Sequence, residues 1–211
     1  MAKHKIILIG GGGHCESSID VIESTNEYKI VGIVDEQLEV GSEVVSYPVI
    51  GKDRDLATLT GKADYAIVTV GQIKSPEIRK HLFHSIKALG YKIPAIGADR
   101  SYVSKHASVG IGSMIFHHAI VNAKAVIGQN CIINTNALIE HHAVIGSHTH
   151  VSTSAVVNGK VTIGEDCFIG SNSVINHGLS ICDHVIIGAG AVIVEDITEP
   201  GTYVGNPARK K

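Results

Sequence analysis

The chain has 211 residues, a formal net charge of −2 at neutral pH, 18% charged residues and no tryptophan. This length is enough for one or two domains with a buried core, and the near-neutral charge excludes a general basic footprint for nucleic acid. The sequence has no apolar run of about 18 residues and no basic segment ahead of an apolar one, so we expect neither a transmembrane helix nor a signal peptide.

Apolar stretches alternate with helical patterns over the first hundred residues. The predicted elements are, in chain order, a strand at 5–9, a helix at 16–23, a strand at 29–34, a short polar helix from residue 52, a strand at 65–70, a helix at 75–89 and a strand at 91–96. This alternation predicts a small Rossmann-like α/β domain over residues 1–100.

Four glycines, residues 10–13, separate the first predicted strand from the first predicted helix. Glycines let the backbone come close to a ligand, and a helix N-terminus offers free amides to an anion. The dinucleotide fingerprint asks for a further glycine where Cys15 stands, and the domain is too short for a full dinucleotide fold. The pattern therefore leaves two interpretations open: a tight turn without a ligand, or a mononucleotide or nucleotide-sugar site.

In the second interpretation, the ligand lies at the carboxyl ends of the strands, where the polar residues of this domain gather. Gly12, Gly13 and His14 would meet phosphate or sugar. Asp35 and Glu36 would meet ribose or base, because a carboxylate accepts hydrogen bonds from two hydroxyls or from an imide N–H.

From Val103 onward every sixth residue is Val or Ile, through sixteen consecutive hexads that end with the one led by Ile193. The position four residues after each of these leads is mostly Ala, Ser, Cys or Thr. Neither a helix nor a half-buried strand repeats every six residues, whereas a parallel β-helix does, with one short strand and one corner per hexad. We expect a β-helix domain over residues 101–211, with the irregular tail 199–209 folded back over the last coil.

Hexads of this kind resemble those of the hexapeptide-repeat acyltransferases, whose fold is a left-handed parallel β-helix with three hexads in each triangular coil. The resemblance alone implies the left hand, since the usual crossover is right-handed. A three-sided prism packs naturally as a closed cyclic trimer. We therefore expect a homotrimer with ligand sites in the grooves between neighbouring prisms.

The densest histidine cluster of the coil begins with His141 and His142, which directly follow Glu140. Residues three hexads apart should stack, which places His141, Gly159 and His177 in one column. A histidine beside a bare glycine can act as a general base, with room for a substrate over the glycine. A solvated corner residue is the default interpretation of any single histidine here.

Neither the cysteines nor the histidines have the spacing of a metal site. The four cysteines share no CxxC pattern, and Cys131 and Cys167 stand at small positions of the hexads, which suits buried free thiols in a reducing cytoplasm. β-Helix carbonic anhydrases bind zinc through an HxxxxH pair, but no histidine of this coil has another five residues on. We expect no disulfide and no metal.

Four longer stretches resemble the NeuD/PglD family of sugar acetyltransferases and together span nearly the whole chain. They are ILIGGGGHCESSIDVI, IINTNALIEHHAVIG, HVSTSAVVNGKVTIGEDCFIGSNSVI and VGNPARK. The resemblance implies a cytoplasmic homotrimer that uses acetyl-CoA and a nucleotide-linked amino sugar.

The resemblance also implies three groups of site residues. The catalytic group is His141 as the base, Glu140 and His142 beside it, and Asn134 near the acceptor. The acetyl-CoA group is His150, which hydrogen-bonds the cofactor, and the backbone of Gly159, Ser171 and Ala189 along the pantetheine arm. The nucleotide-sugar group is Gly12, Gly13, His14, Asp35, Glu36 and Gly71.

One position departs from the family. Its members often carry an acidic residue directly after the catalytic histidine, where this sequence has His142. Either Glu140 or a group from another coil orients His141, or the base is weaker, which is adequate for an amine and less so for a hydroxyl. In the opposite direction, STSAVVNG resembles the sialic acid O-acetyltransferase branch more closely.

The favoured function is N-acetylation of a UDP-4-amino-4,6-dideoxy sugar in bacterial surface-glycan biosynthesis, and O-acetylation of a sialic acid is the second. A different class is a non-catalytic trimeric scaffold that binds a nucleotide sugar. The joint presence of His141, Asn134 and His150 disfavours that scaffold. The missing histidine pair disfavours a metal-dependent hydratase.

Overall fold

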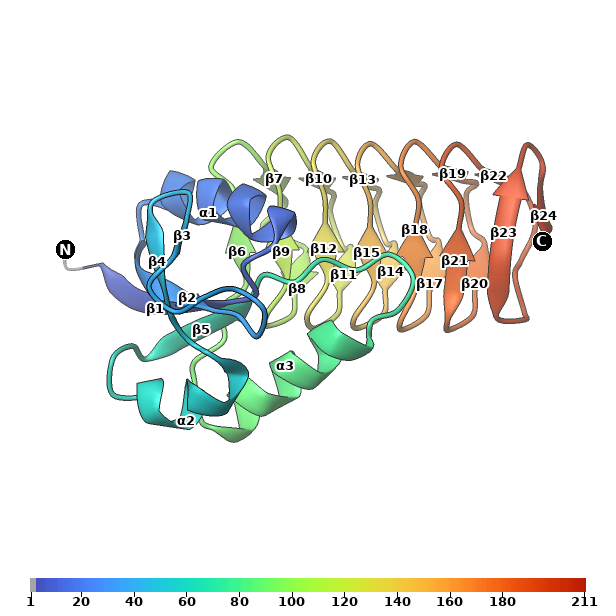
Figure 1. Cartoon of the computed structure of the whole chain (residues 1–211). Helices are drawn as coiled ribbons and strands as arrows, with labels where there is room; N and C mark the ends of the chain where they lie inside the picture. The colour runs from blue at the N-terminus through green and yellow to red at the C-terminus, as the bar shows by residue number, and fades with distance from the viewer. Residues whose placement is uncertain (1–2) are drawn as a thin grey trace. The chain divides into compact units, whose positions relative to one another are not determined.

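The computed structural model describes residues 3–211, which form two compact units (Figure 1). The first unit comprises the residues up to Gly71 together with Glu77–Ile96, and the second comprises Gln72–Pro76 and Gly97–Lys211. The sequence pattern groups the short segment Gln72–Pro76 with the first domain, but its contacts are those of the second unit.

The first unit is a five-stranded sheet with helices on both faces (Figure 1). The strand order is β3-β4-β2-β1-β5, and every pair is parallel except β3 with β4. The strands are β1 (His4–Ile9), β2 (Tyr28–Val34), β3 (Glu43–Val44), β4 (Tyr47–Gly51) and β5 (Tyr65–Val68). The helices are α1 (Gly13–Thr25), the 3₁₀ turn η1 (Asp53–Asp55), α2 (Leu56–Leu59) and α3 (Glu77–Ala88).

Alternation along β1 builds an apolar layer on each face of this sheet. Ile7 and Ile9 pack with Phe83 of α3 and with the leucines of α2 in one buried cluster. Because successive side chains of a strand point to opposite faces, Ile6 and Leu8 face the other way. That second face is covered by α1, as Figure 1 shows. The carboxyl ends of β1, β2 and β5 are left open between these layers.

The predicted strand at 91–96 is wrong. Within that stretch Lys92 forms one isolated bridge with Tyr65, and the next strand, β6 (Ile96–Gly97), starts at its last residue. Pro94 has no N–H to donate to a ladder, so it interrupts the pairing that the apolar pattern suggests.

The second unit is a parallel β-helix, so the predicted fold class, an α/β domain followed by a β-helix, is confirmed. One sheet contains β7 (Tyr102–Val103), β10 (Ile120–Val121), β13 (Leu138–Ile139), β16 (Val156–Val157), β19 (Val174–Ile175) and β22 (Val192–Ile193). A second contains β8 (Ser108–Val109), β11 (Val126–Ile127), β14 (Val144–Ile145), β17 (Thr162–Ile163) and β20 (Ser180–Ile181). The third contains β6, β9 (Met114–Ile115), β12 (Ile132–Ile133), β15 (His150–Val151), β18 (Phe168–Ile169), β21 (Val185–Ile187), β23 (Gly201–Gly205) and β24 (Ala208–Lys210).

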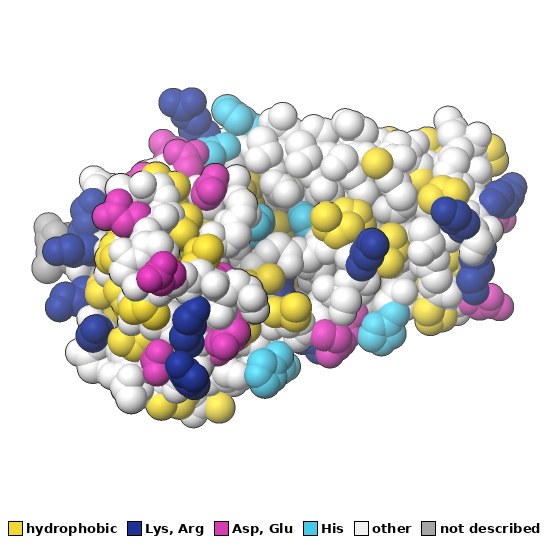
Figure 2. All heavy atoms as spheres, viewed as in Figure 1, with side chains coloured by type: hydrophobic (Ala, Val, Ile, Leu, Met, Phe, Trp, Pro, Cys, Tyr) yellow, Lys and Arg dark blue, Asp and Glu magenta, His cyan; other side chains and the backbone are white. Residues whose placement is uncertain are grey.

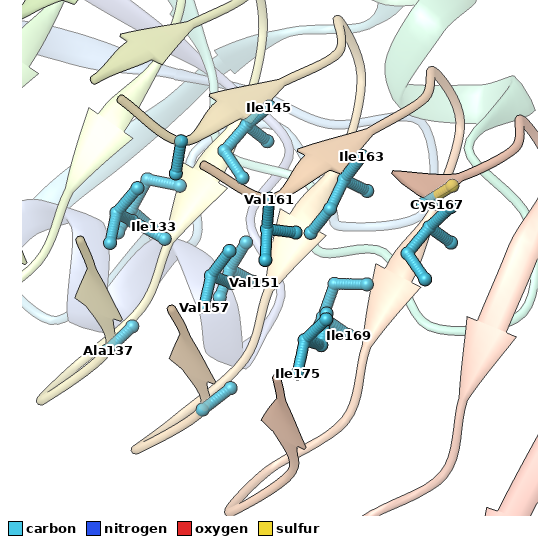
Figure 3. Packing of buried hydrophobic residues seen from close by; sticks show 14 of the residues in the cluster. Ile133, Ala137, Ile145, Val151, Val157, Val161, Ile163, Cys167, Ile169 and Ile175 are labelled. Atoms are coloured by element: carbon cyan, nitrogen blue, oxygen red, sulfur yellow. The ribbon is translucent and has the colours of Figure 1, made fainter. Parts of the chain in front are cut away.

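Strands three hexads apart pair in register and stack their lead residues inside the coil. Ile133 pairs with Val151, and Val151 pairs with Ile169. Figure 3 shows these three side chains as one inward column, with Ile145 and Ile163 in a neighbouring column. The β-branched leads thus form one continuous buried core along the coil.

Except at the first and last leads, the residue three positions after the lead turns the corner in the left-handed region, from Gly112 at φ 75° to Gly190 at φ 69°. Asn, Asp, His and Gly reach this region more readily than other residues, and they occupy most of these corners. His142, at φ 61°, is one of them. The sequence pattern drew attention to the small residue that follows this position rather than to the corner itself.

The tail closes the coil as a hairpin. β23 pairs in parallel with β21, and β24 returns antiparallel to β23. Ala208 is buried in the core of the coil, and Lys210 Nζ lies 2.9 Å from Glu199 Oε2. The irregular tail therefore folds back over the last coil, as predicted.

One outer face of the coil is apolar over its whole length. The outward residues of the sheet from β7 to β22 are Tyr102, Ile120, Leu138, Val156, Val174 and Val192. Ile120 is 40% exposed and Tyr102 is 57% exposed. A different sheet, the one that contains β12, β15 and β18, faces the viewer in Figures 1 and 2, and it also carries few charged side chains over the middle coils. Among residues 3–211, no helix is both long and apolar enough to span a membrane.

Candidate active site

The His141 column forms as the period of the coil predicts. β13 ends at Ile139, and the next residues turn the corner toward β14. His141 is stacked on the following coil, where the N–H of Lys160 donates to the His141 carbonyl at 3.0 Å. A Cβ placed on Gly159 would lie 2.7 Å from Cε1 and 2.8 Å from Nε2 of the His141 ring. The exposed imidazole therefore lies on bare backbone, and His177 follows with its ring centroid 6.3 Å away.

No hydrogen bond joins the Glu140 carboxylate to the His141 ring among the described residues. Its Oε2 accepts hydrogen bonds from the main-chain N–H of His141 at 3.0 Å and from Nδ2 of Asn122 at 3.2 Å. The ring contact comes from His142, whose Nδ1 lies 3.1 Å from Nδ1 of His141, with the two ring planes at 88°. Glu140 thus forms hydrogen bonds to the main chain of His141 and to Asn122, while His142 contacts the His141 imidazole.

His150 is buried, 6% exposed, and both ring nitrogens are engaged. Its Nδ1 lies 2.6 Å from the main-chain carbonyl oxygen of Gln72, and a carbonyl can only accept, so Nδ1 carries the proton. In the neutral ring Nε2 is then an acceptor, and Asn134 Nδ2 donates to it at 3.2 Å. Donation from Nε2 to a thioester oxygen would require the imidazolium form of His150.

Gln72 is a site residue that the sequence pattern missed. It is 4% exposed, and its Nε2 donates to the carbonyl of Cys167 at 3.2 Å. Its Oε1 is buried without a hydrogen-bond partner among residues 3–211. The hexad period gives no hint of Gln72, because the residue reaches the coil from outside the repeat.

Ser171 and Ala189 share one corner of the coil, as their spacing predicts. The N–H of Gly190, next to Ala189, donates to the Ser171 carbonyl at 2.8 Å. Ser171 Oγ lies 3.0 Å from Oγ of Ser152. Ser171 is half-buried and Ala189 is exposed, so the backbone along this corner is accessible to an extended ligand.

The structure separates the predicted coil residues into two groups on opposite edges of the apolar sheet. The first group lies on the corner that follows β13 and β16 and contains Glu140, His141, His142 and Gly159. The second lies on β15 and on the corner that follows β12, β18 and β21 and contains Asn134, His150, Ser171 and Ala189. One chain therefore brings the predicted base to Gly159 but not to the other predicted cofactor residues, His150, Ser171 and Ala189.

The first unit contains a cavity of about 580 Å³ at the carboxyl ends of β1, β2 and β5. This is where the strand order reverses around β1, which is the usual ligand position in open parallel sheets. The lining residues are Gly10, Asp35, Glu36, Gln37, Asp53, Val70, Glu77, Ile78, His81 and Leu82. The predicted Asp35 and Glu36 are among them.

Asp35 also holds the glycine loop. Its Oδ2 accepts from the N–H of Gly11 at 2.7 Å, and its Oδ1 accepts from the N–H groups of Gln37 and Leu38 at 2.8 and 2.9 Å. Burial alone would raise the pKa of the Asp35 carboxyl, but these three donors and the nearby Lys52 together hold it below its ordinary value. The carboxylate is therefore part of the scaffold of the cavity.

The remaining predicted loop residues do not line the cavity. Gly12 caps α1 and Gly13 opens it, and a Cβ on either would meet no atom within 4 Å, so both are open to a ligand. A Cβ on Gly71 would lie 3.3 Å from Cβ of His14, which places those two residues together.

Three titratable residues of the cavity, Asp53, Glu77 and His81, were missed by the sequence pattern. Burial, with Glu36 and Asp35 close by, raises the pKa of the Asp53 carboxyl. Asp53 follows the end of parallel strand β4, so the rule that singled out Asp35 could have found it. Glu77 and His81 lie on α3, where an exposed helix face gives no such indication.

The cysteines are free thiols, and three of them, Cys15, Cys131 and Cys167, are buried. Burial raises the pKa of Cys15 to about 11 and that of Cys167 to about 12, so these thiols stay protonated and unreactive near neutral pH. In the described part of the chain, no group of three or more His, Cys, Asp or Glu side chains is placed to hold a metal ion.

Comparisons with known proteins match both units. The model of the PglD N-terminal domain matches residues 5–86, and that of the hexapeptide repeat of succinyl-transferase matches residues 160–195. The acetyltransferase domain of PglB from Neisseria gonorrhoeae FA1090 is 30% identical with a TM-score of 0.93, over 99% of this chain and 100% of that one. The same domain in complex with acetyl coenzyme A gives 31% and 0.92, over 100% of both chains.

A third structure is PerB from Caulobacter crescentus in complex with CoA and GDP-perosamine. It is 27% identical with a TM-score of 0.92, over 100% of this chain and 98% of that one. The sequence motifs, the two units and these full-length matches agree. The chain belongs to the NeuD/PglD-type sugar acetyltransferases of the hexapeptide-repeat superfamily.

Proposed function

We propose that this protein transfers the acetyl group of acetyl-CoA to the amine of a nucleotide-linked amino sugar, with His141 as the general base. The observation that carries the proposal is the His141 imidazole lying on the bare backbone of Gly159, with Nε2 2.8 Å from where a Cβ would be. The imidazole fills the space that a side chain at position 159 would take, and its exposed position leaves the ring accessible to an acceptor.

The full-length relatives support this reaction class. PglB is represented by its acetyltransferase domain with acetyl coenzyme A, and the Caulobacter crescentus protein is a perosamine N-acetyltransferase in complex with CoA and GDP-perosamine. The perosamine N-acetyltransferase favours nitrogen over oxygen as the acceptor atom. We favour a UDP-linked 4-amino-4,6-dideoxy sugar and treat the GDP-linked sugar as the direct alternative.

In the proposed reaction, His141 accepts one proton and later releases it, and no covalent enzyme intermediate is needed. The amine lone pair attacks the thioester carbonyl carbon, and His141 Nε2 takes the proton that the nitrogen releases. The C–S bond then breaks, the sulfur leaves with its electron pair, and the imidazolium returns the proton to it. The products are the N-acetyl sugar and CoA. Positioning and general base assistance supply most of the acceleration.

The cavity of the first unit is the proposed nucleotide site. Its carboxylates suit ribose hydroxyls and the N–H groups of a base, while the free amides of Gly12 and Gly13 at the start of the 13-residue helix α1 suit phosphate. Because the amides of Gly12 and Gly13 would bind the phosphate, the acidic side chains can line the part of the site that binds the ribose and the base.

We further propose that the acetyl-transfer site forms between copies of the chain in a homotrimer. The two groups of coil residues lie on opposite edges of the apolar sheet, so a second copy must bring one group to the other. The uncharged outward row from Tyr102 to Val192 is the surface that would be buried in this assembly.

The test is release of CoA thiol from acetyl-CoA with a panel of acceptors, and mass spectrometry of the products. The panel contains UDP- and GDP-linked 4-amino-4,6-dideoxy sugars and free and CMP-linked sialic acids. We expect an N-acetylated nucleotide sugar. Turnover on sialic acids alone would replace the proposal with O-acetylation. A protein that binds UDP or GDP but releases no thiol with any acceptor would be a scaffold.

A further inference from the structure

His142 stands where the family often has an acidic residue, and it is the residue that touches the His141 ring. The two Nδ1 atoms are 3.1 Å apart and the ring planes meet at 88°. Glu140 is the nearest carboxylate along the chain. Its Oε2 accepts hydrogen bonds from the main-chain N–H of His141 and from Nδ2 of Asn122. Among the described residues, the polar contact to Nδ1 of His141 is therefore an imidazole rather than a carboxylate.

A hydrogen bond between two Nδ1 atoms needs one of them protonated and the other bare. His141 can accept a substrate proton at Nε2, beside Gly159, only if its own proton is on Nδ1. His142 must then present a bare Nδ1 and carry its proton on Nε2. This arrangement requires His142 to be neutral, because an imidazolium has no nitrogen lone pair to accept with.

The surroundings of His142 keep it neutral. Lys124 and Lys160 occupy the same left-handed corner on the preceding and following coils, at φ 61° and 60°. Partial desolvation comes first among the causes that lower the pKa of His142, followed by Lys124, His141 and Lys160. Glu140 and His177 are the other titratable groups at this corner, and their described contacts are with the His141 residue, Asn122 and the His141 ring.

We propose that His142 is a positioning residue that fixes the tautomer of the general base as a neutral hydrogen-bond acceptor. This inference rests on the proposed role of His141. A carboxylate at the same place would also raise the basicity of His141, whereas a neutral imidazole orients the ring without adding negative charge. The pair is therefore matched to an amine acceptor, which needs less help from a base than a hydroxyl does.

Three substitutions at this corner separate positioning from folding. His142→Gly removes the acceptor without backbone strain, because glycine adopts φ 61° freely. His142→Asn suits the same conformation and keeps a side-chain acceptor. His142→Glu restores a carboxylate. His118→Gly is the matched control, since it removes another corner histidine at φ 61°.

We expect His142→Gly to lower kcat about tenfold or more, part of the 10²–10⁴-fold that a general base contributes, with KM unchanged. His142→Asn should recover most of this loss, and His118→Gly should behave as wild type. In His142→Glu the acid limb of kcat/KM should move about one pH unit higher, because a neighbouring carboxylate raises the pKa of His141. Wild-type kcat and an unchanged pH profile in His142→Gly would overturn the proposal.

A second measurement does not depend on activity. Nitrogen chemical shifts of the two imidazoles at pH 7.5 should report a proton on Nδ1 of His141 and on Nε2 of His142. The reverse tautomers, or a charged His142, would overturn the proposal. A protein that shows the expected tautomers but acetylates no sugar would overturn the proposed function and leave the histidine pair intact.

Discussion

Gly159 is a glycine for space rather than for backbone conformation. Its φ does not fall in the left-handed region, so an alanine fits the backbone there. The added Cβ would instead lie 2.7 Å from Cε1 of His141, which is closer than real contacts allow. Because the imidazole is the free end of a side chain, the ring would swing away while the coil stays in place.

Gly159→Ala should therefore damage catalysis and spare the fold. We expect kcat to fall about 100-fold, the usual cost of misplacing a reacting group by roughly 1 Å, with an unchanged melting temperature. Gly61→Ala is the control, because a Cβ there would meet no atom within 4 Å. A wild-type kcat in Gly159→Ala would show that catalysis does not require the His141 imidazole to lie over residue 159.

Contacts between single residues are predicted where they follow from the hexad repeat, and not where they depend on the choice of hydrogen-bond partner. The contact of His141 with Gly159 follows from their separation by three hexads, which any strict coil would impose. The contact of His142 with His141 does not follow from the spacing. Either Glu140 or His142 could bind the His141 ring, and Glu140 instead accepts hydrogen bonds from the His141 main-chain N–H and from Asn122. Sequence spacing cannot rank those competing hydrogen bonds.

The segment Gln72–Pro76 is the element whose placement the sequence hides most. It follows β5, yet its contacts are with the coil, where the Gln72 carbonyl accepts from His150 and the Gln72 side chain donates to Cys167. Gln72→Ala keeps the carbonyl and removes the anchor. We expect the KM for acetyl-CoA to rise about tenfold, the cost of roughly 1.4 kcal/mol, which is the net value of a buried hydrogen bond.

The control for Gln72→Ala is Lys74→Ala, an exposed residue of the same segment. We expect Lys74→Ala to keep both KM and kcat. An unchanged KM for acetyl-CoA in Gln72→Ala would show that His150 does not depend on this anchor.

The glycine loop between β1 and α1 depends on a charge. A carboxyl whose pKa is lowered by folding stabilises the protein above its unfolded pKa of about 3.9, and that contribution disappears as the pH falls through the folded value. Asp35 has such a lowered pKa. We expect Asp35→Asn to lower the free energy of unfolding by about 1–2 kcal/mol at pH 7, from the weakened hydrogen bonds to Gly11, Gln37 and Leu38.

Urea titrations of wild type and Asp35→Asn at pH 7 and pH 3 check this expectation. The difference should be smaller at pH 3 than at pH 7, because the contribution of the charge begins to disappear below the unfolded pKa of about 3.9. A difference that is equally large at both pH values would mean that Asp35 acts through its shape rather than its charge.

For the molecule as a whole, the hexads were enough to predict the β-helix, and the alternation of strands and helices was enough to predict the α/β domain. The period also places the corners, and with three hexads to each coil it puts His141 and Gly159 on one corner and Ser171 and Ala189 on another. Residue spacing could not place the segment Gln72–Pro76, because it lies outside the repeat.

The proposed trimer follows from this separation and from the apolar face between the two edges. Val156→Glu places a charge in the middle of that face, on β16, and should yield a folded monomer with no measurable acetyl transfer. Thr162→Glu, an exposed outward position on β17 in another sheet, is the control and should keep both assembly and activity. Light scattering after gel filtration measures the mass, and an active Val156→Glu monomer would exclude a shared site.

The most direct measurement of the central claim is the rate of CoA thiol release by wild type and His141→Ala. Acetyl-CoA is saturating, and the acceptor is the amino sugar that the wild type acetylates. His141 is exposed, so the variant should fold normally and bind both substrates. We expect kcat to fall by about 10²–10⁴-fold with little change in KM. A kcat close to that of the wild type would contradict the assignment of His141 as the general base.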